Sequence, residues 1–353
     1  MDRSDRKFDI LYSIVRDYIK TAEPVGSRTI EKKYNIGISS ATIRNEMADL
    51  EEMGFLMQPH ASAGRVPSDK AYRLYVDRYM KSMNLDSYIK ADVRELYSQY
   101  FGEFNELIKK TAEVLTKLTN LTAIATLPDI SELNIKEMRL MHIDSDRVLL
   151  VVITKEGIVK NAEVRLSQIP VREQLDRLTE FLNLCARDIQ NDTTGATFTK
   201  ALDQLSPDEQ RMLKEIFSTV KHLLSEDTGS RLYADGVTEI FKYPEFRNDT
   251  DKAARFLEVL HRRDLMAQLI DEMATDGVRI RIGEENELDE LSDCSIISAT
   301  YRLNGKPIGS IGIVGPTRID YDYCVSVINA LTEELTNHLN ESIGGSLDNG
   351  KGE

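Results

Sequence analysis

The chain of 353 residues is long enough for two or three domains, and its 41% hydrophobic content suffices for buried cores. Its formal net charge of −14 argues against a protein that binds nucleic acid over its whole surface. The charge is uneven, because residues 1–80 carry 13 Lys and Arg against 12 Asp and Glu, whereas the remainder carries 32 against 47. Only the N-terminal part can therefore tolerate phosphate, provided that its basic side chains lie on one face.

Two helices are predicted before residue 35. Apolar residues recur at helical spacing on the first of them, and the segment 23–26 then breaks the chain with a Pro and a Gly. A short second helix is predicted over 27–34, followed by a tight turn at 35–38 that contains a residue suited to positive φ. The apolar stripe of the first helix consists of Phe8, Leu11, Ile14, Val15 and Tyr18.

A third helix is predicted over residues 39–54. Apolar residues at 43, 47 and 50 form one stripe, a serine at 39 or 40 can cap the start, and Gly54 can end the helix in a left-handed conformation. The outward face begins with short polar side chains and one Arg, which can read base edges in a major groove. Its second half is acidic and would be repelled by phosphate, so only the first two turns can enter the groove. The DNA-contacting residues expected here are Ser39, Ser40, Thr42, Arg44 and Asn45.

A β-wing is predicted directly after this helix. Residues 55–58 and 65–67 can pair as two short strands around a loop at 59–64. We expect His60 and Ser62 in the loop and Arg65 at its base to contact phosphate or the minor groove. Many cytosolic helices carry an Arg and an Asn on a solvated face, but the order of helix, turn, helix and wing favours a winged helix-turn-helix.

Residues 87–119 are predicted to form a helix with a heptad seam. One alternative is an amphipathic helix lying on the sheet of its own domain, and the other is a seam between two chains. Gly102 within the run argues against a long coiled coil. The seam residues are Val93, Tyr97, Tyr100, Phe104, Leu107, Thr111, Val114 and Leu118.

The rest of the chain predicts an α+β multidomain protein. Strands are expected at 137–143, 147–154 and 158–166, and again at 277–282, 294–302 and 307–314, with a closing helix at 321–339. Helices are expected between the two strand groups at 171–189, 207–224 and 252–273, with a short strand near 237–241. The simplest account is one antiparallel-sheet domain that is interrupted by a mostly helical insertion. Residues 343–353 are expected to form a disordered tail.

No constellation predicts catalysis, a metal or a cofactor. Asp293 and Cys294 near the acidic segment 283–286 are the best candidates for an acid–thiol site, but Cys294 opens an apolar strand, where a core thiol is favoured. Cys185 and Cys324 also stand in apolar contexts, and the five His residues have no ligand-like spacing. The chain lacks a signal peptide and a membrane-spanning run, so a cytoplasmic protein that does not enter a membrane is expected.

Several runs carry a family resemblance. Segments 23–29, 39–51 and 58–68 near the N-terminus, and 282–286, 293–301 and 309–321 far downstream, resemble HrcA, the bacterial heat-inducible transcription repressor family. The resemblance implies a GAF-like domain with an inserted dimerisation domain. It also implies an operator called CIRCE, an inverted repeat upstream of chaperone operons, and GroEL as the chaperonin that keeps the repressor active. The implied domains are 1–80 (DNA-binding), 81–119 (linking helix), 120–185 with 258–342 (GAF-like) and 186–257 (inserted).

A homodimer is expected on physical grounds, because one helix reads only a few base pairs and a two-fold dimer presents two helices to an inverted repeat. We expect the insertion to supply much of the interface, since its apolar stripe is more than a small module can cover. That stripe consists of Leu213, Ile216, Phe217, Val220 and Leu224. The alternative function is a ligand-responsive repressor, in which the GAF-like domain and the polar loop 283–286 hold a small molecule.

Overall fold

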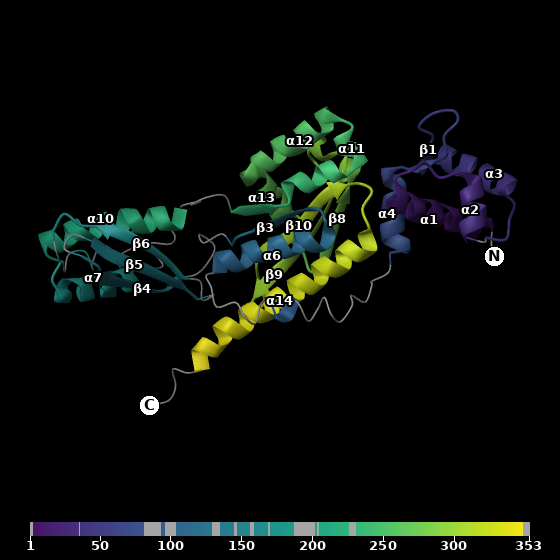
Figure 1. Ribbon diagram of the computed structural model, residues 1–353. Helices are drawn as coiled ribbons and strands as arrows, with labels where there is room; N and C mark the ends of the chain where they lie inside the picture. Colours follow the sequence, from purple (N-terminus) through teal and green to yellow (C-terminus); the bar gives the residue numbers. More distant parts are fainter. Residues whose placement is uncertain are drawn as a thin grey trace. The chain divides into compact units, whose positions relative to one another are not determined.

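The structure is a computed structural model, and it describes residues 3–34, 36–80, 93–95, 104–128, 135–144, 147–155, 159–168, 170–186, 202, 205–225 and 231–348 (Figure 1). The chain divides into two compact units. The first consists of 1–126, 232–301 and 309–338, and the second of 127–231, 302–308 and 339–353.

The first unit begins with the predicted order of helix, helix, helix and wing. Its elements are α1 (Arg3–Thr21), α2 (Ser27–Tyr34), α3 (Ser40–Glu52), β1 (Leu56–Met57), β2 (Val66–Pro67) and α4 (Asp69–Arg78). Strands β1 and β2 pair antiparallel, with Leu56 opposite Pro67. Gly37 and Gly54 have φ of 78° and 75°, which confirms the left-handed positions expected in the turn and at the end of α3. Asn35 lies outside the described residues.

The core of this N-terminal module is built from the predicted stripes. Leu11, Ile14 and Val15 of α1 are buried, and they face the buried side of α3. On α3, Ile43 and Leu50 are fully buried, as the helical spacing requires. Phe8 and Tyr18, at the ends of the α1 stripe, are half-buried.

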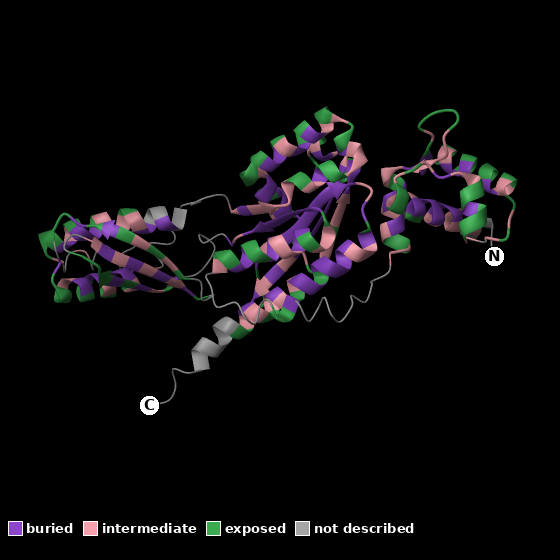
Figure 2. Cartoon of the chain, in the orientation of Figure 1, coloured by how far each residue is buried: buried purple, intermediate pink, exposed green. Residues whose placement is uncertain are grey.

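A five-stranded antiparallel sheet follows in the same unit. Its strands are β3 (Thr122–Thr126), β7 (Leu232–Asp235), β8 (Val278–Ile282), β9 (Cys294–Leu303) and β10 (Lys306–Pro316), in the order β7-β3-β10-β9-β8. All five residues of β3 are buried, because helices cover both faces of the sheet (Figures 1 and 2). Helices α12 (Thr250–His261) and α13 (Arg263–Glu272) pack on one face around Phe256 and Met266.

The opposite face carries α6 (Phe104–Thr119) and α14 (Tyr321–Asp348). The buried side of α6, which includes Leu107 and Thr111, packs against β3. Over 104–119 the heptad-like helix is therefore an amphipathic helix on its own sheet, the first of the two alternatives. Tyr97 and Tyr100 lie outside the described residues.

The second unit contains a separate three-stranded sheet. Strands β4 (Ile135–His142), β5 (Arg147–Thr154) and β6 (Val159–Arg165) form an antiparallel meander in the order β4-β5-β6. Helices α7 (Arg172–Leu184) and α10 (Pro207–Ser225) share its core. The strand positions were predicted correctly, but their assignment to the same sheet domain as β8 to β10 was wrong. Antiparallel meanders close through local pairing, so the spacing of strands does not reveal which sheet they join.

The ends of the inserted segment meet on the first unit. Thr126, the last residue of β3, is the pairing partner of Leu232, the first residue of β7, and the Leu127 N–H donates to the Arg231 carbonyl at 2.6 Å. The sheet of the first unit is therefore interrupted by 127–231, whereas the sequence predicted 186–257. Residues 232–257 of the predicted insertion belong to the first unit, where α12 packs on β3 and its neighbours.

Three further expectations are corrected. Residues 237–241 lie in a 3-10 helix, Val237–Lys242, and the strand precedes it as β7. Helix α14 continues to Asp348, past the start of the predicted tail, since Gly inside a helix costs only about 1 kcal/mol. Four residues of the α10 stripe pack within their own unit, with Ile216 and Val220 fully buried, while the side chain of Leu224 lies outside the described residues. Within the described part of the chain, no helix is both long and apolar enough to cross a bilayer.

Candidate nucleic-acid interface

The start of α3 is held by a small polar network. Ser39 is the N-cap, and its Oγ accepts the Thr42 N–H at 3.3 Å and lies 3.1 Å from Thr42 Oγ1. Glu31 of α2 accepts the Ser40 N–H at 3.1 Å, which ties the two helices together. Three of the predicted contact residues therefore take part in hydrogen bonds at the start of the helix. Ser39 stays exposed, whereas Ser40 and Thr42 are half-buried.

Arg44 and Asn45 form the outward tip of α3. Both are exposed, while Ile43 between them and the capping network is fully buried. Neither side chain has a hydrogen bond or ion pair with another residue in the described part of the chain. A guanidinium fork and an amide on the first two turns are the groups that pair with guanine and adenine edges.

The acidic half of α3 is neutralised by α1. Glu46 is buried, and its Oε1 accepts a hydrogen bond from Arg6 Nη2 at 2.8 Å. Lys7 Nζ lies 2.7 Å from Asp49 Oδ2 and 3.6 Å from Glu46 Oε2. Hydrogen bonding to Asp49 raises the pKa of Lys7, so this side chain stays charged. Two carboxylates of α3, those of Glu46 and Asp49, thus join α1 to α3.

The wing loop is organised by Gln58, which the sequence analysis did not single out. Its Nε2 donates to the carbonyls of Ala61 at 3.0 Å and Ala63 at 3.1 Å, and so closes the loop from inside. His60 and Ser62 are exposed at the tip, with Ser62 Oγ 3.2 Å from His60 Nδ1. The structure therefore brings these two predicted residues together on the surface.

Arg65 lies at the base of the wing, where it is already paired. Its Nη2 is 2.8 Å from Glu51 Oε2 of α3, and its side chain is only 19% exposed. Its backbone forms a two-way bridge with Val25, with both N–H to O distances 2.9 Å. In this geometry the guanidinium fixes the wing to α3, and the phosphate contact expected for Arg65 stays a prediction.

Gly64 allows the wing to approach the segment before α2. A Cβ at this position would lie 2.5 Å from the Val25 carbonyl carbon and oxygen. Because backbone atoms cannot yield cheaply, Gly64→Ala is expected to destabilise the protein by about 1–3 kcal/mol. Thermal unfolding measures the change. Gly26→Ala is the matched control, since its Cβ would meet nothing closer than Thr29 Oγ1 at 3.9 Å. Equal melting temperatures for the two variants would contradict the close approach.

Two exposed cations on α2 extend the candidate interface. Arg28 and Lys32 stand one helical turn apart on the side opposite the buried Ile30. No ion pair joins either of them to another residue within the described ranges. The first helix of a helix-turn-helix crosses the phosphate backbone, which is where such side chains are useful. Their i, i+4 spacing in the sequence could have revealed them.

The candidate acid–thiol pair has a structural role. Burial raises the pKa of Cys294 and keeps it protonated, so it is not a nucleophile at neutral pH. Asp293 Oδ1 lies 2.5 Å from Lys252 Nζ, and Asp293 Oδ2 lies 3.4 Å from Arg255 Nη2, both on α12. These ion pairs join α12 to the start of β9.

Comparisons with known proteins cover nearly the whole chain. The model of the family described as "HrcA protein C terminal domain" matches residues 105–325. A protein of Thermoanaerobacter pseudethanolicus named "Heat-inducible transcription repressor HrcA" is 42% identical over 348 residues, which is 96% of this chain and 98% of that protein. One of the same name from Clostridium tetani is 40% identical over 337 residues, 95% of each chain.

A solved structure has a similar fold. The crystal structure of a hypothetical protein at 2.2 Å resolution superposes with a TM-score of 0.67 and 23% sequence identity, and the match covers 96% of this chain and 99% of that one. At this level of identity the likeness concerns the fold alone.

Proposed function

The chain belongs to the HrcA family of heat-inducible transcription repressors, and on that premise we propose that it represses chaperone operons by binding the CIRCE inverted repeat as a homodimer. The family consists of regulators rather than enzymes. Repression of operons would place the protein with the chromosome in the cytoplasm. We also propose that its sheet domain is GAF-like and that GroEL maintains its active form.

The exposed tip of α3 is the observation that carries the proposal. Arg44 and Asn45 stand on the first two turns, next to a capped N-terminus whose free N–H groups favour a negative charge. Arg28 and Lys32 on α2 supply charge for the phosphates on one side, and the wing tip with His60 supplies polar groups beyond β1. The remaining acidic side chains of α3 are largely paired, so the tip can meet phosphate.

The proposed dimer uses the open face of the β4-β5-β6 sheet. Buried and half-buried residues alternate along β5 (Figure 2), so Leu149, Val151 and Ile153 point away from the core of the unit. Met141 of β4 and Val159 of β6 lie on the same face, 47% and 57% exposed. A second copy of the chain is the occupant we propose, because an inverted repeat requires a two-fold partner and a two-fold axis can place this face against itself.

The open face also carries matched charges around its apolar centre. Arg139 is 2.6 Å from Glu137 on β4, and Arg147 of β5 is 3.0 Å from Glu163 of β6. An apolar centre with a polar rim is the usual composition of a protein interface. A balanced rim also avoids net repulsion between two identical faces.

The rival ligand-responsive reading loses the feature that supported it. The polar loop at 283–286, considered there as a ligand contact, is occupied by side chains of α4. We therefore keep GroEL-dependent repression as the single proposal. Transcription of a chaperone operon in vitro tests it: the protein with GroEL should repress the operon more strongly than the protein alone, and an unfolded client added in excess should relieve repression. Repression that is indifferent to GroEL would contradict that part of the proposal.

Arg28→Ala is expected to weaken specific and non-specific DNA binding alike. Loss of one phosphate contact should lower the slope of log affinity against log salt by about one unit. Arg65→Ala is the matched control, since it removes the same charge from a side chain that is bound to Glu51. Titrations at several salt concentrations give both slopes. A larger fall in this slope for Arg65→Ala than for Arg28→Ala would place the phosphate contact at the base of the wing.

A further inference from the structure

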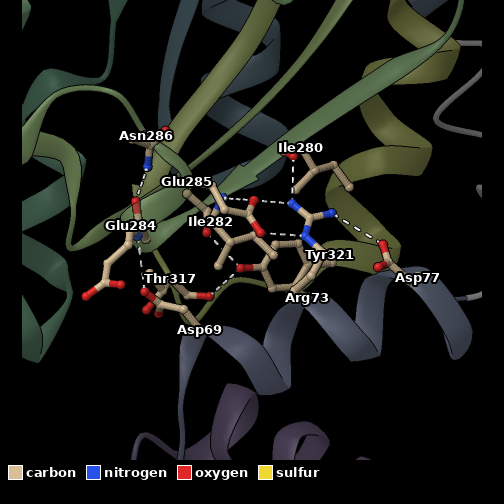
Figure 3. A network of polar contacts seen from close by, with 12 residues as sticks. Asp69, Arg73, Asp77, Ile280, Ile282, Glu284, Glu285, Asn286, Thr317 and Tyr321 are labelled. Carbon is tan, nitrogen blue, oxygen red and sulfur yellow. Dashed lines mark hydrogen bonds and ion pairs between the residues drawn. The ribbon is translucent and has the colours of Figure 1, made fainter. Parts of the chain in front are cut away.

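The turn at Gly283–Glu285 lies against α4, the helix that leaves the wing (Figure 3). Arg73 of α4 points its guanidinium into this turn. Its Nε donates to Glu285 Oε1 at 2.7 Å, and its Nη2 donates to the second oxygen of Glu285 and to the Ile280 carbonyl at 2.8 Å. A bidentate fork of this kind fixes direction as well as distance.

Asp69, one turn earlier on α4, makes the second contact. Its carboxylate accepts the Glu284 N–H at 3.3 Å and lies directly over Gly283, where any Cβ would overlap it. Gly283 also has φ of 56°, so two independent constraints require Gly there. Burial raises the pKa of Asp69, and the Glu284 N–H partly offsets this effect.

The turn itself is held by several hydrogen bonds of its own. The Asn286 side chain is buried, and its Nδ2 lies 2.9–3.0 Å from the carbonyls of Gly283, Leu291 and Cys294. Glu285 in addition accepts the Ile282 N–H at 2.9 Å. Each residue from 283 to 286 therefore makes a contact, through its backbone or its side chain, that shapes the turn or binds α4.

Two more contacts fix the same module from other sides. Arg318 Nη1 donates to the Ile19 carbonyl of α1 at 2.7 Å while its Nε bonds Glu245 at 2.5 Å. The Tyr75 hydroxyl of α4 donates to Asp322 of α14. Directional contacts at both α1 and α4 leave the module little freedom to rotate on the sheet domain.

The docked arrangement leaves the reading face open. Ser39, Arg44 and Asn45 are all exposed while these contacts are formed. The contacts therefore do not block DNA, and they act on orientation instead.

We propose that the 283–286 turn is a socket for α4 that sets the direction in which α3 is presented, with Asp69, Arg73 and Glu285 as positioning residues for the reading of an inverted repeat. This inference rests on the proposed dimeric DNA binding. Within a dimer, two modules held rigidly have one preferred half-site spacing, whereas two loosely tethered modules tolerate many.

The test compares Arg73→Ala and Glu285→Ala with the parent on a series of repeats that differ only in spacer length, and on a single half-site. The parent should prefer one spacer by roughly tenfold or more. Both variants should flatten that preference and keep their half-site affinity within about twofold, because they do not touch the reading face. Arg73→Lys, which keeps the charge without the fork, should be intermediate.

Glu284→Ala is the matched control. It removes a carboxylate from the same turn, but the hydrogen bond to Asp69 comes from the backbone N–H and is retained, so the variant should keep the parental spacer preference. Hydrogen exchange provides a readout without DNA: the Glu284 amide should exchange faster in Arg73→Ala than in the parent.

Unchanged spacer preference together with unchanged exchange in Arg73→Ala would overturn the socket. Tighter operator binding by Arg73→Ala would also overturn it, since the contacts would then restrain an inactive state. If the parent failed to distinguish the repeat from random DNA, the proposed function would fail, and the exchange result alone would decide whether the turn holds α4.

Discussion

Excision of residues 127–231 is expected to leave a folded monomer that has lost most of its affinity for the full inverted repeat. Thr126 and Leu232 are cross-strand partners on β3 and β7, so an Asn-Gly turn between them should close a two-residue hairpin without disturbing the sheet. The dimer contact proposed on Leu149, Val151 and Ile153 leaves with the excised segment. Affinity for the full repeat should fall by about 10²–10⁴-fold, the contribution of a linked second site.

Light scattering on the excised protein measures its mass, and titration on the full repeat and on one half-site measures the two affinities. The half-site affinity should match that of the parent. A milder variant in the whole chain, Val151→Lys, should also favour the monomer. Glu180→Lys, on the exposed side of α7, is its control. A stable dimer after excision would place the interface in the first unit, and a monomer that still strongly prefers the full repeat would refute the two-fold argument.

Arg44→Ala is expected to weaken operator binding by about 1–3 kcal/mol for each half-site. The side chain is exposed and has no partner among the described residues, so the melting temperature should stay close to that of the parent. The loss should be greatest at one base position, which a series of operators with single base changes can identify. Equal affinity of the variant and the parent would remove α3 from the role of recognition helix.

Asp49→Ala is the contrasting variant on the same helix. Because the acidic half of α3 is expected to stay out of the groove, removal of this carboxylate should leave DNA binding unchanged or slightly improved. The structure adds that Asp49 pairs with Lys7, so the variant also loosens α1 from α3. A small loss of stability without loss of base selectivity is therefore the expected result.

The local elements of the fold could be predicted from the sequence because their signals are local. A Ser cap, an apolar stripe and a terminal Gly define α3 within one or two residues. The positions of β4 to β6 and of β8 to β10 were also correct, since alternation and turn residues mark them, whereas β3 was not predicted and the strand expected near 237–241 lies earlier, as β7. The family resemblance pointed to the regulatory class.

Contacts between distant segments could not be predicted in this way. Nothing in the spacing of β4, β5 and β6 shows that they form their own sheet, and only the pairing of Thr126 with Leu232 reveals where the insertion starts and ends. The ion pair between Arg65 and Glu51 was not predicted because Glu51 is fourteen residues away on another element. The segment 283–286 was considered for an acid–thiol site and for ligand binding. Its contacts with α4 were not predicted, because α4 lies over 200 residues upstream.

A footprint of the purified protein on DNA upstream of its own chaperone operon tests directly whether a dimer binds an inverted repeat there. We expect two protected segments of related sequence and opposite orientation, with centres separated by about one helical turn of DNA or a multiple of it. Arg44→Ala should lose both segments together at the concentration where the parent protects them. A single protected segment, or protection without two-fold symmetry that Arg44→Ala retains, would contradict the reading of an inverted repeat by two α3 helices.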